Sequence, residues 1–171
     1  WDNSRDGIPV FIVAGQSNMV GRGRFDKGQK NEVGGIGSLR YYVKKNPRAY
    51  GHLMTKNGGW KQLKDVYYMH YGLKMKPLDS VTKRDSFGPE FGFAHAVRKH
   101  IKNKPILIIK TAWGGKSLVS DFCSPSAADR RDAEVGFYYK AMMKEVREKL
   151  ANFDKLFPEY AGKGYYIKGM A

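Results

Sequence analysis

A serine stands at the point where an apolar run of the chain ends. Positions 8–14 read Ile-Pro-Val-Phe-Ile-Val-Ala, and Gly-Gln-Ser-Asn-Met follows at positions 15–19. A short β-branched run of this kind is typical of a strand buried on both faces of a parallel sheet. Ligands of open α/β sheets bind outside the carboxyl ends of such strands. The pattern therefore places Ser17 where a hydroxyl can meet a substrate.

The neighbours of Ser17 suit a serine nucleophile. Gly15, Gln16 and Asn18 are small or polar, which leaves room for backbone N–H groups to face a developing oxyanion. A serine after a strand is also a common helix N-cap, so the pattern alone leaves both roles open. It is not the Gly-x-Ser-x-Gly elbow, because Met19 replaces the second glycine. It also lacks the Lys-Ser/Thr pair of a phosphate-binding loop, which ranks nucleotide binding last.

The elements that must position Ser17 follow a strand–helix rhythm. Pro89 opens a segment with an apolar stripe at helical spacing, and residues 105–111 form a second buried apolar run. Residues 133–153 predict another helix, and residues 164–171 predict a third strand. Such alternation is typical of a parallel sheet with right-handed crossovers. Because the sequence stops inside that third strand, we expect the chain to be incomplete.

The length of 171 residues predicts one domain, residues 1–171, that can bury its own core. Residues 24–84 show little regular periodicity but many glycines and tyrosines. We interpret them as an ordered, loop-rich insertion at one edge of the site. Its aromatic side chains either contact sugar faces or simply pack the loops.

The formal charge of +15 is spread along the chain rather than gathered in one basic arm. It predicts a solvated basic surface or the attraction of an acidic polysaccharide, and it argues against a nucleic-acid partner. No apolar run approaches the roughly 20 residues of a membrane span. Cys123 is the single cysteine, which excludes an internal disulfide and a multi-cysteine zinc site. Because the sequence opens on Trp1 rather than methionine, we expect a secreted or periplasmic protein.

Three blocks of the sequence resemble the SGNH hydrolases, above all the sialate O-acetylesterase-like group that is related to acetylxylan esterases. The blocks are Gly-Gln-Ser-Asn-Met at 15–19, Phe-Gly-Pro-Glu-Phe at 87–91 and Lys-Thr-Ala-Trp-Gly-Gly-Lys-Ser-Leu at 110–118. They occur in the family's order and on the expected elements. The resemblance implies an α/β fold of the three-layer α/β/α, flavodoxin-like kind. It also implies removal of O-acetyl groups from an acetylated oligo- or polysaccharide, with no metal or other cofactor.

The resemblance also implies roles for individual residues. Ser17 would be the nucleophile and would supply one oxyanion donor through its backbone N–H. A second N–H would come from the turn at Gly114 and Gly115, which is otherwise an ordinary tight turn after a strand. Gln16 and Asn18 would orient the turn or the substrate.

Two roles are open for Glu90. It either binds Arg22 or a loop amide near the site, or it only complements the dipole at a helix N-terminus.

The sequence departs from the family pattern at its end. Family members next carry a Trp-x-Gln-Gly-type block and, later, the Asp and His that serve the nucleophile, and no such residues follow in this sequence. Since a serine hydroxyl without a base is a poor nucleophile, we expect this chain to be catalytically incomplete. No pattern singles out one of the four histidines (His52, His70, His95 and His100) as a replacement. The competing interpretation is a non-catalytic carbohydrate-binding module on a hydrolase scaffold.

Overall fold

Five strands form one sheet in the computed structural model, which describes residues 6–70, 76–77 and 86–171. Their order across the sheet is β3-β2-β4-β1-β5, and β2, β4, β1 and β5 run parallel. The short strand β3 is antiparallel to β2. The bounds are β1 Ile8–Gly15, β2 Val66–His70, β3 Lys76–Pro77, β4 Ile106–Ala112 and β5 Tyr165–Met170.

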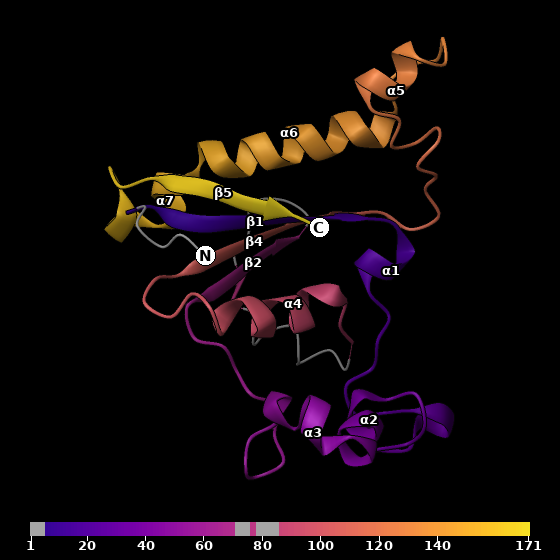
Figure 1. Ribbon diagram of the computed structural model, residues 1–171, viewed down its shortest axis with the longest axis vertical. Helices are drawn as coiled ribbons and strands as arrows, with labels where there is room; N and C mark the ends of the chain where they lie inside the picture. The colour runs from indigo at the N-terminus through magenta and orange to yellow at the C-terminus, as the bar shows by residue number, and fades with distance from the viewer. Residues whose placement is uncertain (1–5, 71–75, 78–85) are drawn as a thin grey trace.

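Helices cover both faces of the sheet (Figure 1). One face packs against α4 (Pro89–Arg98), and the other packs against α6 (Phe137–Ala151) and α7 (Phe153–Leu156). The side chains of β1 alternate between the two: Val10 packs on the α6 side and Phe11 on the α4 side. The predicted three-layer α/β/α fold with a parallel sheet is therefore confirmed.

Shorter helices connect these layers. They are α1 (Ser17–Val20), α2 (Leu39–Lys45), α3 (Pro47–Tyr50) and α5 (Pro125–Asp129), together with 3₁₀ turns at Gln29–Asn31, Gly51–Leu53 and Pro158–Tyr160. In the part of the chain that the structure describes, no helix has the length and apolar character needed to cross a membrane.

The description of residues 24–84 as loop-rich needs correction, because that stretch supplies a strand of the sheet. Its strand β2 pairs with β4 along five residues, and α2 and α3 lie in the same stretch. The sequence Val-Tyr-Tyr-Met-His of β2 does not read as an apolar run, although Val66 and Met69 are fully buried. Residues 71–75 and 78–84 of the predicted insertion lie outside the described part.

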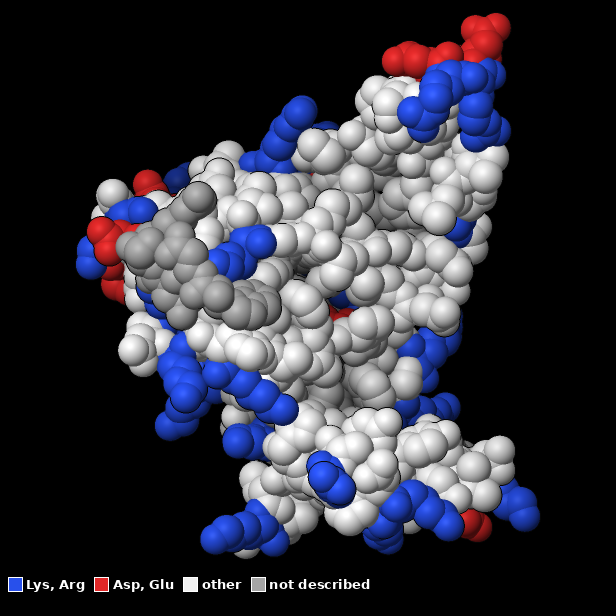
Figure 2. Space-filling view, in the orientation of Figure 1, with Lys and Arg blue, Asp and Glu red and all other residues white. Residues whose placement is uncertain are grey.

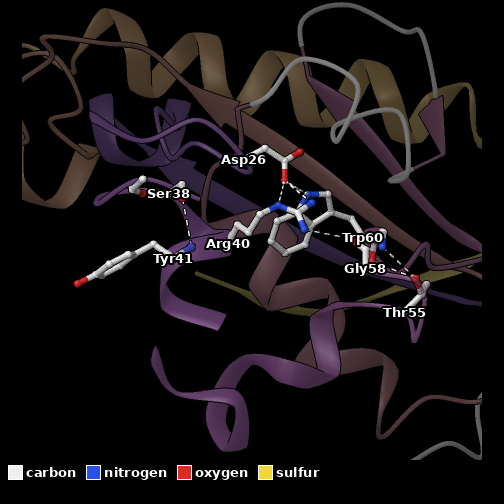
Figure 3. Close-up of polar contacts among 9 residues, drawn as sticks. Asp26, Ser38, Arg40, Tyr41, Thr55, Gly58 and Trp60 are labelled. Atoms are coloured by element: carbon white, nitrogen blue, oxygen red, sulfur yellow. Dashed lines mark hydrogen bonds and ion pairs between the residues drawn. The ribbon is translucent and has the colours of Figure 1, made fainter. Parts of the chain in front are cut away.

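Residues 22–64, which we call the basic lobe, project beyond α4 at one end of the molecule (Figure 1). Phe25 and Leu53 form a small core of their own with Phe91 of α4. A polar network fixes the lobe from within (Figure 3). Asp26 accepts hydrogen bonds from Arg40 Nε at 2.6 Å and from Trp60 Nε1 at 3.1 Å.

The imidazole of His95, on α4, is buried beneath this lobe. Its ring packs 4.7 Å from that of Phe91, and its Nε2 has no hydrogen-bond partner among the described residues. Burial lowers the pKa of His95 to about 4, and the positive charges of His52, Lys61 and Lys99 lower it further, while a hydrogen bond with the Lys61 backbone opposes them. The folded protein therefore holds this ring neutral.

We expect His95 to make the protein acid-sensitive. The unfolded chain binds a proton at His95 below pH 6.5, whereas the folded chain does so only near pH 4. Stability is therefore lost as the pH falls between these two values, by about 2.5 kcal/mol at pH 4.5. Urea unfolding of the wild type and of His95→Leu at pH 7 and pH 4.5 measures this difference. A loss of the same size in both proteins would contradict the assignment; His100→Leu, at an exposed position, is the control.

Candidate active site

Ser17 occupies the first position of α1, directly beyond the carboxyl end of an inner strand. The N-cap of that helix is Gln16, so Ser17 does not cap it. The Ser17 side chain is exposed, and among the described residues nothing hydrogen-bonds its hydroxyl. A hydroxyl that is positioned by a helix and makes no hydrogen bond within the fold is able to react with a substrate.

A buried ion pair holds the segment that carries Ser17 in place. Lys110 of β4 donates to Glu90 Oε2 at 2.8 Å, and both side chains are almost completely buried. Lys110 also donates to the carbonyl of Val20, the last residue of α1, at 2.9 Å. Burial lowers the pKa of Lys110, and the Glu90 carboxylate opposes that shift.

Glu90 also binds the loop that precedes α4. Its Oε1 accepts the backbone N–H of Gly88 at 3.0 Å. A side chain at position 88 would overlap this carboxylate, which explains why glycine stands before Pro-Glu. Of the two partners expected for Glu90, the structure therefore shows the loop amide and not Arg22. Glu90 is buried, and its hydrogen bonds join the loop before α4 to Lys110 of the sheet.

Ser17 and Asn18 line an open hollow of about 500 Å³. Its other walls are Arg22 and Gly23 on one side and residues 87–89 on the other. Two backbone hydrogen bonds between Gly23 and Phe87 hold these walls together, at 3.0 and 2.8 Å. The hollow thus joins the first two of the three sequence blocks.

The Gly114–Gly115 turn begins beside the same strand end. Gly15 pairs with Ala112, and the N–H of Trp113 donates to the Gly15 carbonyl at 3.2 Å. Gly115 has φ +69°, a conformation that favours glycine. Within the described residues, the N–H groups of Gly114 and Gly115 have no hydrogen-bond partner, which leaves them able to bind an anion. These glycines do not line the hollow of Ser17 and Asn18.

A second, mostly apolar hollow of about 270 Å³ lies on the other side of β1. Gln16 lines it, together with Phe122 and Met142. Gln16 and Asn18 therefore face different cavities, although the sequence placed them in one role.

The four histidines do not meet Ser17. His70 ends β2, two strands from β1, and its Nε2 lies 3.5 Å from the Ala112 carbonyl. His95 is buried beneath the basic lobe, and His52 lies beside it. His100 is exposed past the end of α4. Among the described residues, no group of three His, Cys, Asp or Glu side chains is arranged to hold a metal ion.

Sequence reasoning missed the role of Lys110. The signal was present, because a lysine interrupts the otherwise apolar strand Ile-Leu-Ile-Ile-Lys-Thr-Ala. A charge inside a strand that is buried on both faces requires a buried partner of opposite sign. Glu90, the second residue of α4, is the only acid in the second block and therefore the natural candidate.

Comparison with known proteins decides the family. The model of a family described as "Carbohydrate esterase, sialic acid-specific acetylesterase" matches residues 8–162. The chain belongs to this carbohydrate esterase family. The match confirms the resemblance carried by the three sequence blocks, all of which lie inside the matched range.

A solved structure of a protein from Arabidopsis thaliana is also similar to this esterase-family chain. The sequences are 17% identical, the TM-score is 0.49, and the match covers 96% of this chain and 56% of the other. The chain thus spans little more than half the length of that protein. No curated protein matches the present chain.

We expect the buried ion pair to stabilise this esterase-family chain as a unit. Lys110→Met leaves the Glu90 carboxylate buried and unpaired, which should cost about 3–5 kcal/mol. In the double variant Lys110→Met/Glu90→Gln the amide can still accept the Gly88 N–H, so the double variant should be more stable than Lys110→Met alone. Urea unfolding at pH 7 gives the coupling energy. Additive losses would show that the two side chains do not act together.

Proposed function

We propose that this chain carries the nucleophile and the oxyanion donors of a serine O-acetylesterase that acts on acetylated carbohydrate. The proposal is supported by one observation above all. Ser17 stands exposed at the tip of an inner parallel strand, on a wall of an open hollow, in a chain that belongs to a carbohydrate esterase family.

The proposed reaction is acyl transfer in two steps. Ser17 Oγ attacks the acetyl carbonyl carbon, and the negative charge that develops on the carbonyl oxygen is held by backbone N–H groups of Ser17 and of the Gly114–Gly115 turn. Collapse of this intermediate breaks the bond to the sugar oxygen, which leaves with a proton as the free hydroxyl. Water then attacks the acetyl-serine, releases acetate and restores Ser17.

The first step needs a base to accept the Ser17 proton. Because no histidine among the described residues contacts Ser17, we propose that the base is supplied by residues other than those of this chain. The Asp and His that the family carries after its next block are the candidates. The same observation supports the alternative, a carbohydrate-binding module without turnover.

Replacing Ser17 tests the proposal in the intact gene product. Ser17→Ala should abolish release of acetate from acetylated xylan or O-acetyl sialate and should leave the unfolding midpoint unchanged, since the side chain is exposed. Ser120→Ala, at another exposed serine, is the control. Acetate release that survives in Ser17→Ala would end the nucleophile assignment. An intact protein that binds acetylated sugar but releases no acetate would favour the binding module.

A pair of glycine variants tests the second oxyanion donor. Gly115 and Gly162 both have positive φ, +69° and +81°, and a Cβ at either position meets no atom within 4 Å. Alanine should therefore cost each about 1 kcal/mol of stability through backbone strain. Only Gly115→Ala should also lower kcat, by about 100-fold, because it displaces an N–H from the oxyanion. Equal kcat values for the two variants would remove the turn from the mechanism.

A further inference from the structure

The positive charge of the chain is concentrated in the basic lobe. Residues 22–64 contain eleven Lys and Arg residues against two acidic residues, a formal charge of +9 in about a quarter of the chain. The remaining three quarters carry the other +6 of the total +15. The excess can be counted in the sequence, but because the basic residues are spaced singly or in pairs, only the fold shows that they belong to one lobe.

Ten of these eleven side chains are exposed, and they crowd the surface of the lobe (Figure 2). Arg40 is the exception, because it is half-buried and bound to Asp26 in the network of Figure 3. The exposed ones are Arg22, Arg24, Lys27, Lys30, Lys44, Lys45, Arg48, Lys56, Lys61 and Lys64. Clustered like charges repel one another unless a ligand of opposite charge covers them.

The basic surface begins at the candidate active site. Arg22 lines the hollow that contains Ser17, and the chain continues from there into the lobe as an extended segment. Exposure alternates along it: Arg22 and Arg24 are exposed, whereas Phe25 is buried and Gly23 is bonded to Phe87. The two arginines therefore stand on the same side of an extended segment, between the hollow and the rest of the lobe.

Hydrogen bonds and a contact between a guanidinium and an aromatic ring hold the backbone of the lobe together. Arg40 donates to the Gly58 carbonyl at 3.1 Å as well as to Asp26, and its guanidinium lies 5.5 Å from the centre of the Trp60 ring. The backbone N–H of Leu39, the first residue of α2, donates to the Arg24 carbonyl at 2.8 Å. These bonds tie the segment from the hollow to the helices that carry the lysines.

Exposed aromatic rings lie among the charges. Tyr42 on α2 is 48% exposed and Tyr50 on α3 is 40% exposed. Arg40 and Lys44 lie two residues to either side of Tyr42, and Arg48 lies two residues before Tyr50. Tyrosine presents an apolar face and a polar tip, a combination that suits sugar rings. Lysine supplies seven of the eleven positive charges, and each acts as a compact point charge that attracts any anionic group.

We propose that the basic lobe binds a polysaccharide that bears repeated carboxylate or sulfate groups and leads its acetylated units to Ser17. The second half of this statement rests on the proposed esterase function; the first half does not. The polymer would lie along the lobe and enter the hollow past Arg24 and Arg22.

Two triple variants with the same change of charge test the lobe. Lys44→Ser/Lys45→Ser/Arg48→Ser removes three positive charges from α2 and α3. Lys140→Ser/Lys144→Ser/Arg147→Ser removes three equally exposed ones from α6, on the opposite side of the sheet. Binding to polygalacturonate and to heparin is measured by calorimetry at 50 mM and 300 mM NaCl. Neutral xylan and single-stranded RNA are measured alongside.

The lobe variant should bind polygalacturonate or heparin at least tenfold more weakly than the wild type, and the α6 variant less than threefold more weakly. Wild-type affinity should fall with salt, since exposed charges are screened beyond about 8 Å at 0.15 M. The two polymers distinguish a preference for carboxylate from one for sulfate. Equal losses in both variants, no binding to either polymer, or tighter binding to RNA would each overturn the proposal.

Two further proteins keep the result interpretable. If the lobe variant does not fold, as judged by circular dichroism, Lys30→Ser/Lys56→Ser/Lys64→Ser makes the same test at other exposed positions. Ser17→Ala should bind both polymers as the wild type does. If the polymers bind but Ser17 proves dispensable for hydrolysis, the binding role of the lobe is supported and the esterase mechanism is wrong. If Ser17 is required for hydrolysis but neither polymer binds, the esterase mechanism is supported and the binding role of the lobe is wrong.

Discussion

The architecture of the candidate site depends on one buried ion pair, Lys110 with Glu90. Lys110 comes from the sheet, Glu90 from the first turn of α4, and their shared hydrogen bonds reach Val20 on one side and Gly88 on the other. Removing two charges from water is costly, and such a pair is favourable only when its remaining hydrogen-bonding capacity is used. Here the two backbone groups use it. The pair therefore fixes the geometry of three segments that are distant in the sequence.

This arrangement separates the groups that hold the site from those able to react in it. The anchoring charges are buried and hydrogen-bonded, whereas Ser17 and the N–H groups of Gly114 and Gly115 are exposed and without hydrogen-bond partners among the described residues. Helix α1 has only four residues and buries none of them, so packing alone cannot hold it. Because the ion pair holds α1 from its buried side, the exposed side that carries Ser17 stays free, as the proposed oxyanion site requires.

The sequence predicted what depends on local pattern and missed what depends on distant partners. β1, β4 and α4 have apolar runs or stripes and a Pro-Glu helix start, and each was predicted within a few residues. β2 was not predicted from the sequence. Tyrosine and histidine fit a central strand only when neighbouring elements pack against them, and a local pattern does not show those neighbours. Lys110 and Glu90 are twenty positions apart in the sequence, and no periodic pattern indicates that they form a pair. The charge excess of residues 22–64 is already present in the sequence, but only the fold shows that these residues form one lobe that begins at the hollow.

The basic lobe and the sheet meet different physical demands. Near the hollow, the buried charges of Lys110 and Glu90 neutralise each other, because an unpaired buried charge would be costly. On the lobe, eleven positive charges face only two acids, and one of these, Asp26, is bound to Arg40. Water and salt screen such a surface enough for folding, yet its repulsion is relieved most by a ligand with many negative charges. Because the lobe begins at Arg22, which lines the same hollow as Ser17, the proposed polymer would be bound beside the proposed nucleophile.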